Sequence, residues 1–166
     1  MSQISTAFGA ALLLPFLSFG AALAADADAF KGAWKLDAAQ SKAEAGTVPK
    51  SETRIYGVIE EGVLTLIVNG VGADGMPFAY GATGDINGKD YPVTDREQGA
   101  RILGDAITWK KIDDRTVEMD VKKKGGEIIN ATRHSVSTDG KTLTVTENGI
   151  DPDGKPVKAV TVYHRS

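Results

Sequence analysis

The sequence predicts an all-β protein, an antiparallel up-and-down meander that closes into a small β-barrel of about 8–10 strands. Three observations predict this fold. Apolar and polar residues alternate with period two after Asp26, glycine-containing turn dipeptides separate the alternating stretches, and helical periodicity is almost absent. Many hairpin-linked strands leave unpaired edges unless the sheet closes on itself, so a closed or nearly closed barrel is favoured. A two-sheet sandwich is the alternative architecture.

The alternation is clearest in residues 64–68, 116–122 and 142–146, where every second side chain is apolar and the intervening ones are mostly polar. Such a strand has one face for the core and one for water. Dipeptides that can place Gly or Asn at positive φ, as tight hairpin turns require, lie between such stretches. They are Glu61-Gly62, Asn69-Gly70, Asp74-Gly75, Asn87-Gly88, Gly125-Gly126, Asp139-Gly140, Asn148-Gly149 and Asp153-Gly154.

These signals together place about ten strands along the chain. The expected strands are 31–37, 52–60, 63–71, 77–86, 89–93, 105–112, 116–123, 127–137, 142–149 and 156–164. Two segments are the least strand-like. Residues 38–50 have room for one helical turn, and 94–104 resemble a loop or a short helix.

The N-terminal segment has the pattern of a secretory signal peptide. Residues 4–25 carry no charge, an apolar core lies at 10–17, and Ala22-Leu23-Ala24 supplies a small-x-small cleavage pattern. We expect cleavage between Ala24 and Ala27, which divides the chain into a signal peptide at 1–25 and a β-barrel domain at 26–166. The product would lie in the periplasm or outside the cell, with no membrane span after cleavage. An uncleaved apolar anchor is the alternative.

Composition narrows the classes of function. The chain has no cysteine, so disulfides cannot stabilise the domain and the core must do so alone. Its formal net charge of −3 argues against nucleic acid as a partner. No motif indicates a cofactor, and the sequence does not identify a protein partner.

The chain also repeats itself. A shift of 79 residues aligns 53–54 with 132–133, 64–65 with 143–144, 69–70 with 148–149, and 74–77 with 153–156. A duplicated unit would produce these identities, and so would the same hairpin chemistry used twice. Both explanations predict two equivalent three-stranded meanders.

The two ends of the mature domain resemble the calycin superfamily, which contains lipocalins and fatty-acid-binding proteins. Residues 30–36, FKGAWKL, resemble the G-x-W opening strand of those barrels. The segments TRHSVSTDGKTLTVTENG and VTVYHRS resemble the closing strands of a fatty-acid-binding protein. The resemblance implies that Trp34 plugs one barrel end beneath a cationic side chain from a late strand. Simple burial of Trp34 in the core is the other interpretation.

The resemblance carries over only part of a binding site. Fatty-acid-binding proteins hold the ligand carboxylate with interior arginines and a tyrosine. Arg133 and Tyr163 match two of those positions, but Thr161 replaces the second arginine, so the clamp is incomplete. A bacterial lipocalin-like domain of unassigned function is therefore the closer description.

Arg54 and Arg133 are the candidate ligand-binding charges, because they occupy equivalent repeat positions between apolar neighbours. An inward arginine is costly unless it is paired or meets an anionic ligand. Outward-facing arginines are the alternative. Several other side chains could line a pocket, or simply fill the core of a solid barrel. They are Tyr56, Phe78, Tyr80, Tyr91, Trp109, Met119 and Tyr163.

Signals for metal binding and catalysis are weak. His134 and His164 have no third partner at metal-ligand spacing and are interpreted as surface residues. No nucleophile elbow or phosphate loop is present, so no metal site and no catalytic residue are predicted.

The leading hypothesis is therefore an exported lipocalin-like protein that binds a small apolar or amphipathic molecule. The alternative is an envelope structural or protein-interaction β-domain with no small-molecule ligand, which would expose an apolar patch on its surface.

Overall fold

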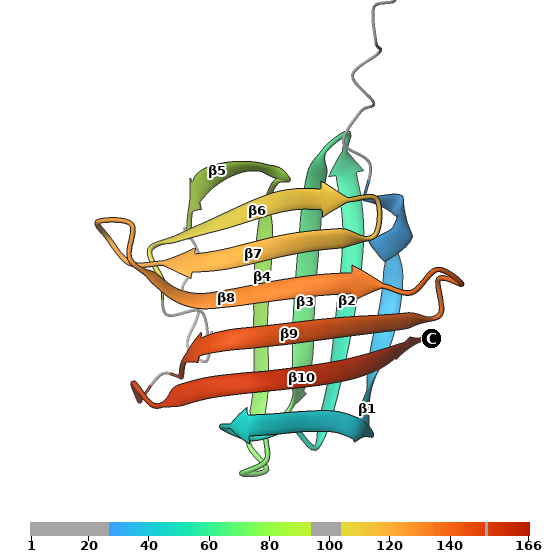
Figure 1. The fold of residues 1–166 in the computed structure, drawn as a ribbon, viewed down its shortest axis with the longest axis vertical. Coiled ribbons are helices and arrows are strands. Elements are labelled where there is room, and N and C mark those ends of the chain that lie inside the picture. The colour runs from blue at the N-terminus through green and yellow to red at the C-terminus, as the bar shows by residue number, and fades with distance from the viewer. Residues whose placement is uncertain (1–26, 94–103, 152) are drawn as a thin grey trace, which may run out of the picture.

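The fold is described from a computed structural model, which covers residues 27–93, 104–151 and 153–166. It is an antiparallel meander of ten strands preceded by a short 3-10 turn, η1 (Figure 1). The elements are η1 Asp28–Phe30, β1 Gly32–Ala45, β2 Ser51–Glu60, β3 Val63–Val71, β4 Pro77–Asp85, β5 Asn87–Pro92, β6 Ala106–Asp113, β7 Thr116–Lys122, β8 Ile128–Val136, β9 Thr142–Ile150 and β10 Pro156–Arg165.

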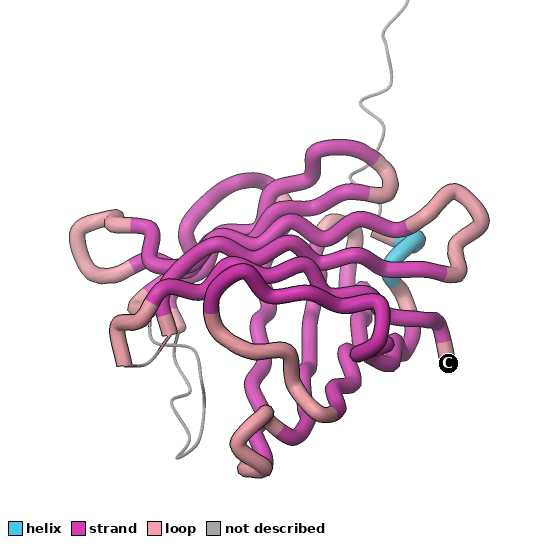
Figure 2. The backbone as a smooth tube through the Cα atoms, turned by 60° about the horizontal axis from the view of Figure 1, so that its bottom comes forward, coloured by secondary structure: helices cyan, strands magenta, loops and turns pink. Residues whose placement is uncertain are grey.

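All ten strands belong to one sheet, in the order β4-β3-β2-β1-β10-β9-β8-β7-β6-β5. The first strand pairs with the last, so the sheet curls into a nearly closed barrel and the predicted fold class is confirmed. Figures 1 and 2 show β6–β10 crossing over β2–β4 as two layers. Because the layers are continuous through β1, the barrel replaces the sandwich considered as the alternative.

Strand β1 departs from the expected helical turn at 38–50. It continues to Ala45, with a register irregularity between Asp37 and Lys42 in its pairing with β10. The Asp37 carboxylate accepts hydrogen bonds from the Gln40 and Ala39 amides, and the Ser41 hydroxyl donates to the Asp37 carbonyl at 2.7 Å. These local bonds satisfy the irregular backbone. They allow β1 to bend away from β2 while it stays paired with β10 (Figure 1).

Two other expectations concern residues outside the described part of the chain. The signal peptide at 1–25 lies there, and so does nearly all of the loop or short helix expected at 94–104.

Strands β4 and β5 form the seam of the barrel, where the sheet order places its two edges. A Cβ atom added to Gly84 on β4 would lie 3.0 Å from the Tyr91 ring and 3.3 Å from the Trp109 ring. Two aromatic side chains therefore cover this glycine. At one end of the seam, the Ile86 carbonyl accepts a 3.1 Å hydrogen bond from the Lys111 amide.

The internal repeat is equivalent in two of its three strands. Strand β3 maps onto β9 with the 79-residue shift, and β4 maps onto β10 with the same inward-facing positions. Strand β8 differs from β2. Arg54 pairs with Val68, but Arg133 pairs with Thr146 rather than with Glu147, the repeat equivalent of Val68.

The hairpin between β2 and β3 differs from the hairpin between β8 and β9, and this explains the different pairing of the two arginines. The β2–β3 hairpin has a register irregularity between Val58 and Glu60, whereas the β8–β9 pairing is regular from Asn130 to Val136. A one-residue change of register turns every side chain of a strand to the opposite face. Equivalent arginines therefore face opposite sides of the barrel wall.

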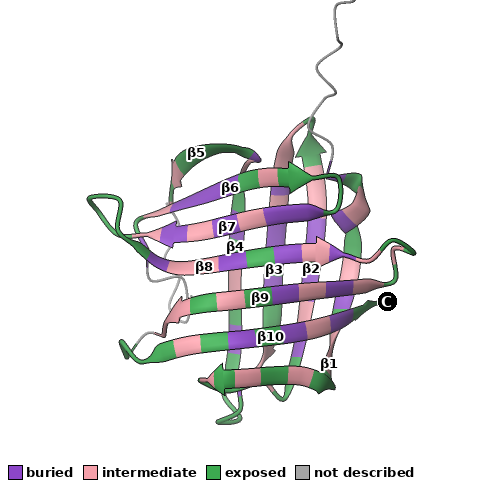
Figure 3. Cartoon of the chain, in the orientation of Figure 1, coloured by how far each residue is buried: buried purple, intermediate pink, exposed green. Residues whose placement is uncertain are grey.

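Trp34 is fully buried. Its indole Nε1 donates to the Phe30 carbonyl at 2.8 Å, and the Arg165 guanidinium lies 4.2 Å from the ring centroid. Arg165 also donates to the Gly140 and Ala29 carbonyls, at 2.7 and 2.8 Å, so it ties the last strand to the start of the domain. Figure 3 shows buried positions alternating with intermediate and exposed ones along strands of both layers.

Gly70 offers a test of the packing on the inner face. An added Cβ would overlap the Ser51 carbonyl oxygen and lie 2.9 Å from the Phe78 ring. We expect Gly70→Ala to lower the free energy of unfolding by about 1–3 kcal/mol, measured by urea denaturation. Gly81→Ala is the control, because its Cβ would lie 3.3 Å from the Leu66 carbonyl, and it should cost under about 1 kcal/mol. Equal losses would contradict this account.

Candidate functional site

The candidate site is a cluster of polar side chains inside the barrel. The alternation of β2 turns Glu52, Arg54 and Tyr56 inward, where they are 8%, 6% and 2% exposed. Strand β10 brings Tyr163 against them, because β2 and β10 lie on either side of β1 in the sheet. An arginine and a glutamate buried together require mutual pairing to offset their lost hydration.

Glu52 is the centre of this charge pair. Its Oε1 accepts hydrogen bonds from Arg54 Nε at 2.6 Å and from the Tyr163 hydroxyl at 2.7 Å. The Arg54 guanidinium carbon also lies 5.0 Å from the Tyr163 ring centroid, within range of a cation–π contact.

The terminal nitrogens of Arg54 retain hydrogen-bonding capacity. A guanidinium has five N–H donors. In the described part of the chain, Nε–H of Arg54 donates to Glu52, and the guanidinium also hydrogen-bonds the Tyr56 hydroxyl. Its five donors outnumber these two partners, so the guanidinium can also receive an anionic or strongly polar group.

The surrounding tyrosines are neutral hydroxyls. Burial raises the pKa of Tyr56 to about 12, against the opposing influence of Arg54. Burial also raises the pKa values of Tyr80 and Tyr163 above the ordinary tyrosine range. All three therefore keep their protons near neutral pH and act as hydrogen-bonding groups rather than as charges.

A second network is centred on His134, which is fully buried. The Tyr56 hydroxyl lies 2.6 Å from Nδ1, and Thr132 Oγ1 lies 2.8 Å from Nε2. Thr132 donates its single hydroxyl hydrogen to the Met119 carbonyl at 3.2 Å, so its oxygen accepts from Nε2–H. Nδ1 is then left to accept from Tyr56. This arrangement satisfies a neutral imidazole, and burial holds the pKa of His134 well below its usual value.

Trp109 contributes a buried donor to the same interior. Its ring meets His134 edge-on, with 5.4 Å between ring centroids. Its indole Nε1 is buried and has no hydrogen-bond partner in the described part of the chain. Leaving such a group unsatisfied costs about 1–3 kcal/mol, so it is a candidate contact for a ligand.

A third polar pair faces the interior from β8 and β9. The inward alternation of Leu143 and Val145 continues to Glu147, whose Oε1 accepts a 2.7 Å hydrogen bond from Asn130 Nδ2. Both side chains are half-buried.

The structure places most of the predicted site residues together in the barrel interior and places one of them on the outer face. Arg133 lies on the outer face, 53% exposed and 2.5 Å from Glu118, so its assignment to the binding site was wrong. The physical reason is the register of β8. The remaining predicted residues face the interior with Arg54, and they are Tyr56, Tyr80, Trp109, Met119 and Tyr163.

Sequence reasoning also missed several members of the cluster. His134 was interpreted as a surface residue but is buried, whereas His164 is exposed beside Asp37. Glu52 and Glu147 were not predicted to face the interior. The period-two spacing of Glu52, Arg54 and Tyr56 was the available signal, since one inward side chain of a strand implies the others.

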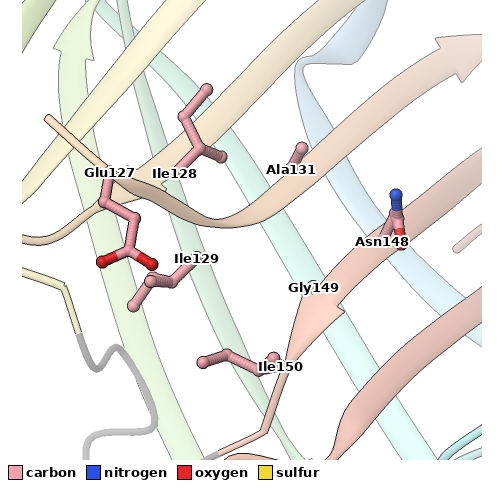
Figure 4. A pocket seen from close by; sticks show the side chains of 7 residues that line it. All are labelled: Glu127, Ile128, Ile129, Ala131, Asn148, Gly149 and Ile150. Carbon is pink, nitrogen blue, oxygen red and sulfur yellow. The ribbon is translucent and has the colours of Figure 1, made fainter.

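A separate hollow of about 300 Å³ lies where β8 begins and β9 ends (Figure 4). It is lined by Glu127, Ile128, Ile129, Ala131, Asn148, Gly149 and Ile150. It shares no residue with the interior cluster, so it is not the candidate site.

Two further properties are limited to the described residues. Within 27–93, 104–151 and 153–166, no three His, Cys, Asp or Glu side chains form a group that could hold a metal. No helix in those ranges is long and apolar enough to cross a membrane.

The buried charge pair predicts a strongly non-additive pair of mutations. Arg54→Met leaves the Glu52 carboxylate buried without its cation, and we expect it to lower the free energy of unfolding by about 3–5 kcal/mol. Glu52→Gln combined with Arg54→Met removes both charges and should recover most of this loss in urea denaturation. Arg133→Met is the matched control and should cost at most about 1 kcal/mol. Additive losses would exclude a coupled pair.

His134 predicts a pH dependence of stability. Its folded pKa lies below the unfolded value of about 6.5, so the full stability is present above that pH. As the pH falls below about 6.5, the unfolded chain gains a proton that the folded chain does not, and stability falls by up to about 1.4 kcal/mol per unit. His134→Gln should flatten the profile of unfolding free energy between pH 7 and 5, and His164→Gln should not. An unchanged slope in His134→Gln would contradict this assignment.

No protein-family model and no curated protein matches the chain. Solved structures do match. The wild-type fluorescent protein UnaG gives a TM-score of 0.57 at 13% identity, covering 85% of this chain and 100% of its own. Zebrafish ileal bile acid-binding protein, complexed with cholic acid, gives 0.48 at 12% identity, covering 83% and 99%.

At such identity the likeness to UnaG concerns the fold alone. The chain shares the β-barrel fold of that protein, in the form of a nearly closed antiparallel meander.

Proposed function

We propose that this protein is an exported calycin barrel that binds a small amphipathic molecule with an anionic group at Arg54. The observation that carries the proposal is the buried guanidinium whose five donors outnumber its two hydrogen-bond partners, Glu52 and Tyr56, among the described residues. Ligand sites of this kind combine apolar walls with a few fixed polar groups. Residues 1–25, with their uncharged apolar segment and small-residue cleavage pattern, support export to the periplasm or the outside of the cell.

The interior supplies both parts of such a site. Leu66, Val68 and Met119 provide buried apolar surface. Arg54 provides charge and Trp109 an unsatisfied N–H. An anion at Arg54 would gain charge-assisted hydrogen bonds in a setting where water competes poorly. The interior networks described above place hydroxyls and a neutral imidazole rather than an activated nucleophile, which supports binding rather than catalysis.

Two matched fluorescent probes test the proposal. 8-Anilinonaphthalene-1-sulfonate carries a sulfonate on the aromatic skeleton of N-phenyl-1-naphthylamine, which is uncharged. We expect the anionic probe to bind the wild type more tightly. The variant with both Glu52→Gln and Arg54→Met should weaken its binding about tenfold or more and leave the neutral probe nearly unchanged. Titrations would follow probe fluorescence.

Arg133→Met is the control, because it removes the same charge from the outer face. Glu52→Gln alone should strengthen sulfonate binding, since it frees Arg54 from its partner. Equal sulfonate binding by the wild type and the double variant would exclude Arg54 as the anchor.

A protein-interaction domain is the second candidate. Cross-strand pairing aligns Ala33, Ile55, Ile67 and Gly81 in one row over β1–β4, and the two isoleucines are 41% and 51% exposed on the outer face. Failure of both probes to bind would favour this candidate over the interior site.

A further inference from the structure

We propose that the ligand is bipolar: its anionic group meets Arg54, and a cationic or N–H-donating group meets Glu147. The inference rests on the proposed function and narrows its ligand class. It begins from an asymmetry between the inward carboxylates. Glu52 is neutralised by Arg54 at 2.6 Å, whereas Glu147 has no cationic partner among the described residues.

The placement of Glu147 is fixed by its strand. It is the third inward position of β9 after Leu143 and Val145, and its neighbour Asn130 occupies an inward position of β8. Asn130 donates one hydrogen bond to it. An ionised carboxylate has about four lone-pair sites, so most of its accepting capacity is unused.

Other glutamates of the described chain show what this position lacks. Glu118, which is half-buried on the outer face, meets Arg133 at 2.5 Å, and the exposed Glu44 meets Lys158 at 2.6 Å. Glu147 is half-buried and directed inward, where a lone charge is more costly. A ligand cation is the partner that this geometry can accept.

Tyr80 faces the same interior from β4, which lies in the layer opposite β9 (Figure 1). Burial raises the pKa of Tyr80, so its hydroxyl is neutral. The inner faces of the barrel therefore carry a positive group on β2, a negative group on β9 and a neutral hydroxyl on β4. A ligand with both charges would satisfy both groups, while a simple anion would meet Arg54 and be repelled by Glu147.

The test compares carboxylic acids that differ only in a terminal amino group. Hexanoic, octanoic and dodecanoic acids are each paired with the ω-amino acid of the same chain length, because the spacing of the two charges in the ligand must match the site. Isothermal titration calorimetry on the wild type should show at least one chain length at which the amino acid binds about tenfold more tightly than the plain acid.

Matched variants test whether Glu147 causes the preference for the amino acid. Glu147→Gln keeps an oxygen for Asn130 and removes the charge, so the advantage of the amino acid should fall below about threefold while plain-acid binding holds or improves. Glu118→Gln makes the same change on the outer face and should preserve the advantage. The wild-type comparison needs no variant, so it stands even if Glu147→Gln fails to fold.

The outcomes separate the two proposals. Binding of plain acids with no gain from any amino group, or a gain that survives Glu147→Gln, would overturn the bipolar ligand and leave the anion site at Arg54 intact. Failure of every acid and amino acid to bind, together with failure of both fluorescent probes, would overturn the proposed function itself.

Discussion

The double pairing of β1 is the constraint on which the rest of the structure depends. Residues 32–35 pair with β2, and β1 pairs with β10 from Trp34 to Ala45, on both sides of the irregularity between Asp37 and Lys42. This arrangement joins the two ends of the meander into one curved sheet. It also assembles the interior, because Glu52 and Tyr163 are separated by 111 residues of sequence and meet only through the closed wall. Without that strand there would be two meanders and no shared interior.

The buried polar groups then follow a consistent electrostatic logic. Among the described residues, Arg54 is the one cation of the interior, and neutral hydroxyls and a neutral imidazole lie near it. Each proton of the His134 network has an acceptor, so this part of the interior is satisfied by the protein itself. Arg54, Trp109 and Glu147 are different, since each retains capacity that the described residues do not use. The His134 network therefore stabilises the fold, whereas Arg54, Trp109 and Glu147 have the capacity to bind a further group.

Local patterns in the sequence predicted the strands well, because alternation and turn chemistry act over a few residues. Val117, Met119 and Val121 alternate as expected along β7, and the predicted bounds of β3 agree with the structure. The bend of β1 was missed because a strand irregularity held by Asp37 looks like a turn in sequence. Arg133 was predicted to resemble Arg54 because the repeat aligns the two residues. The face of the sheet to which a side chain points depends instead on the register set by each hairpin. Contacts such as Tyr56 with His134 join distant strands, and a single sequence does not encode them visibly.

Closure through β1 and β10 also has a consequence for the order of folding. The first strand of the domain cannot complete its pairing until the last strand has been synthesised, so the barrel is dominated by contacts between distant parts of the chain. Such topologies fold slowly, since a long loop must close before its contacts become favourable. Until β10 arrives, β1 and β9 keep unpaired edges that could associate with other chains. A chain that remains unfolded during synthesis and folds only when complete would pass through that exposed stage once. Because the sequence has no cysteine, its folding does not have to wait for disulfide bonds to form.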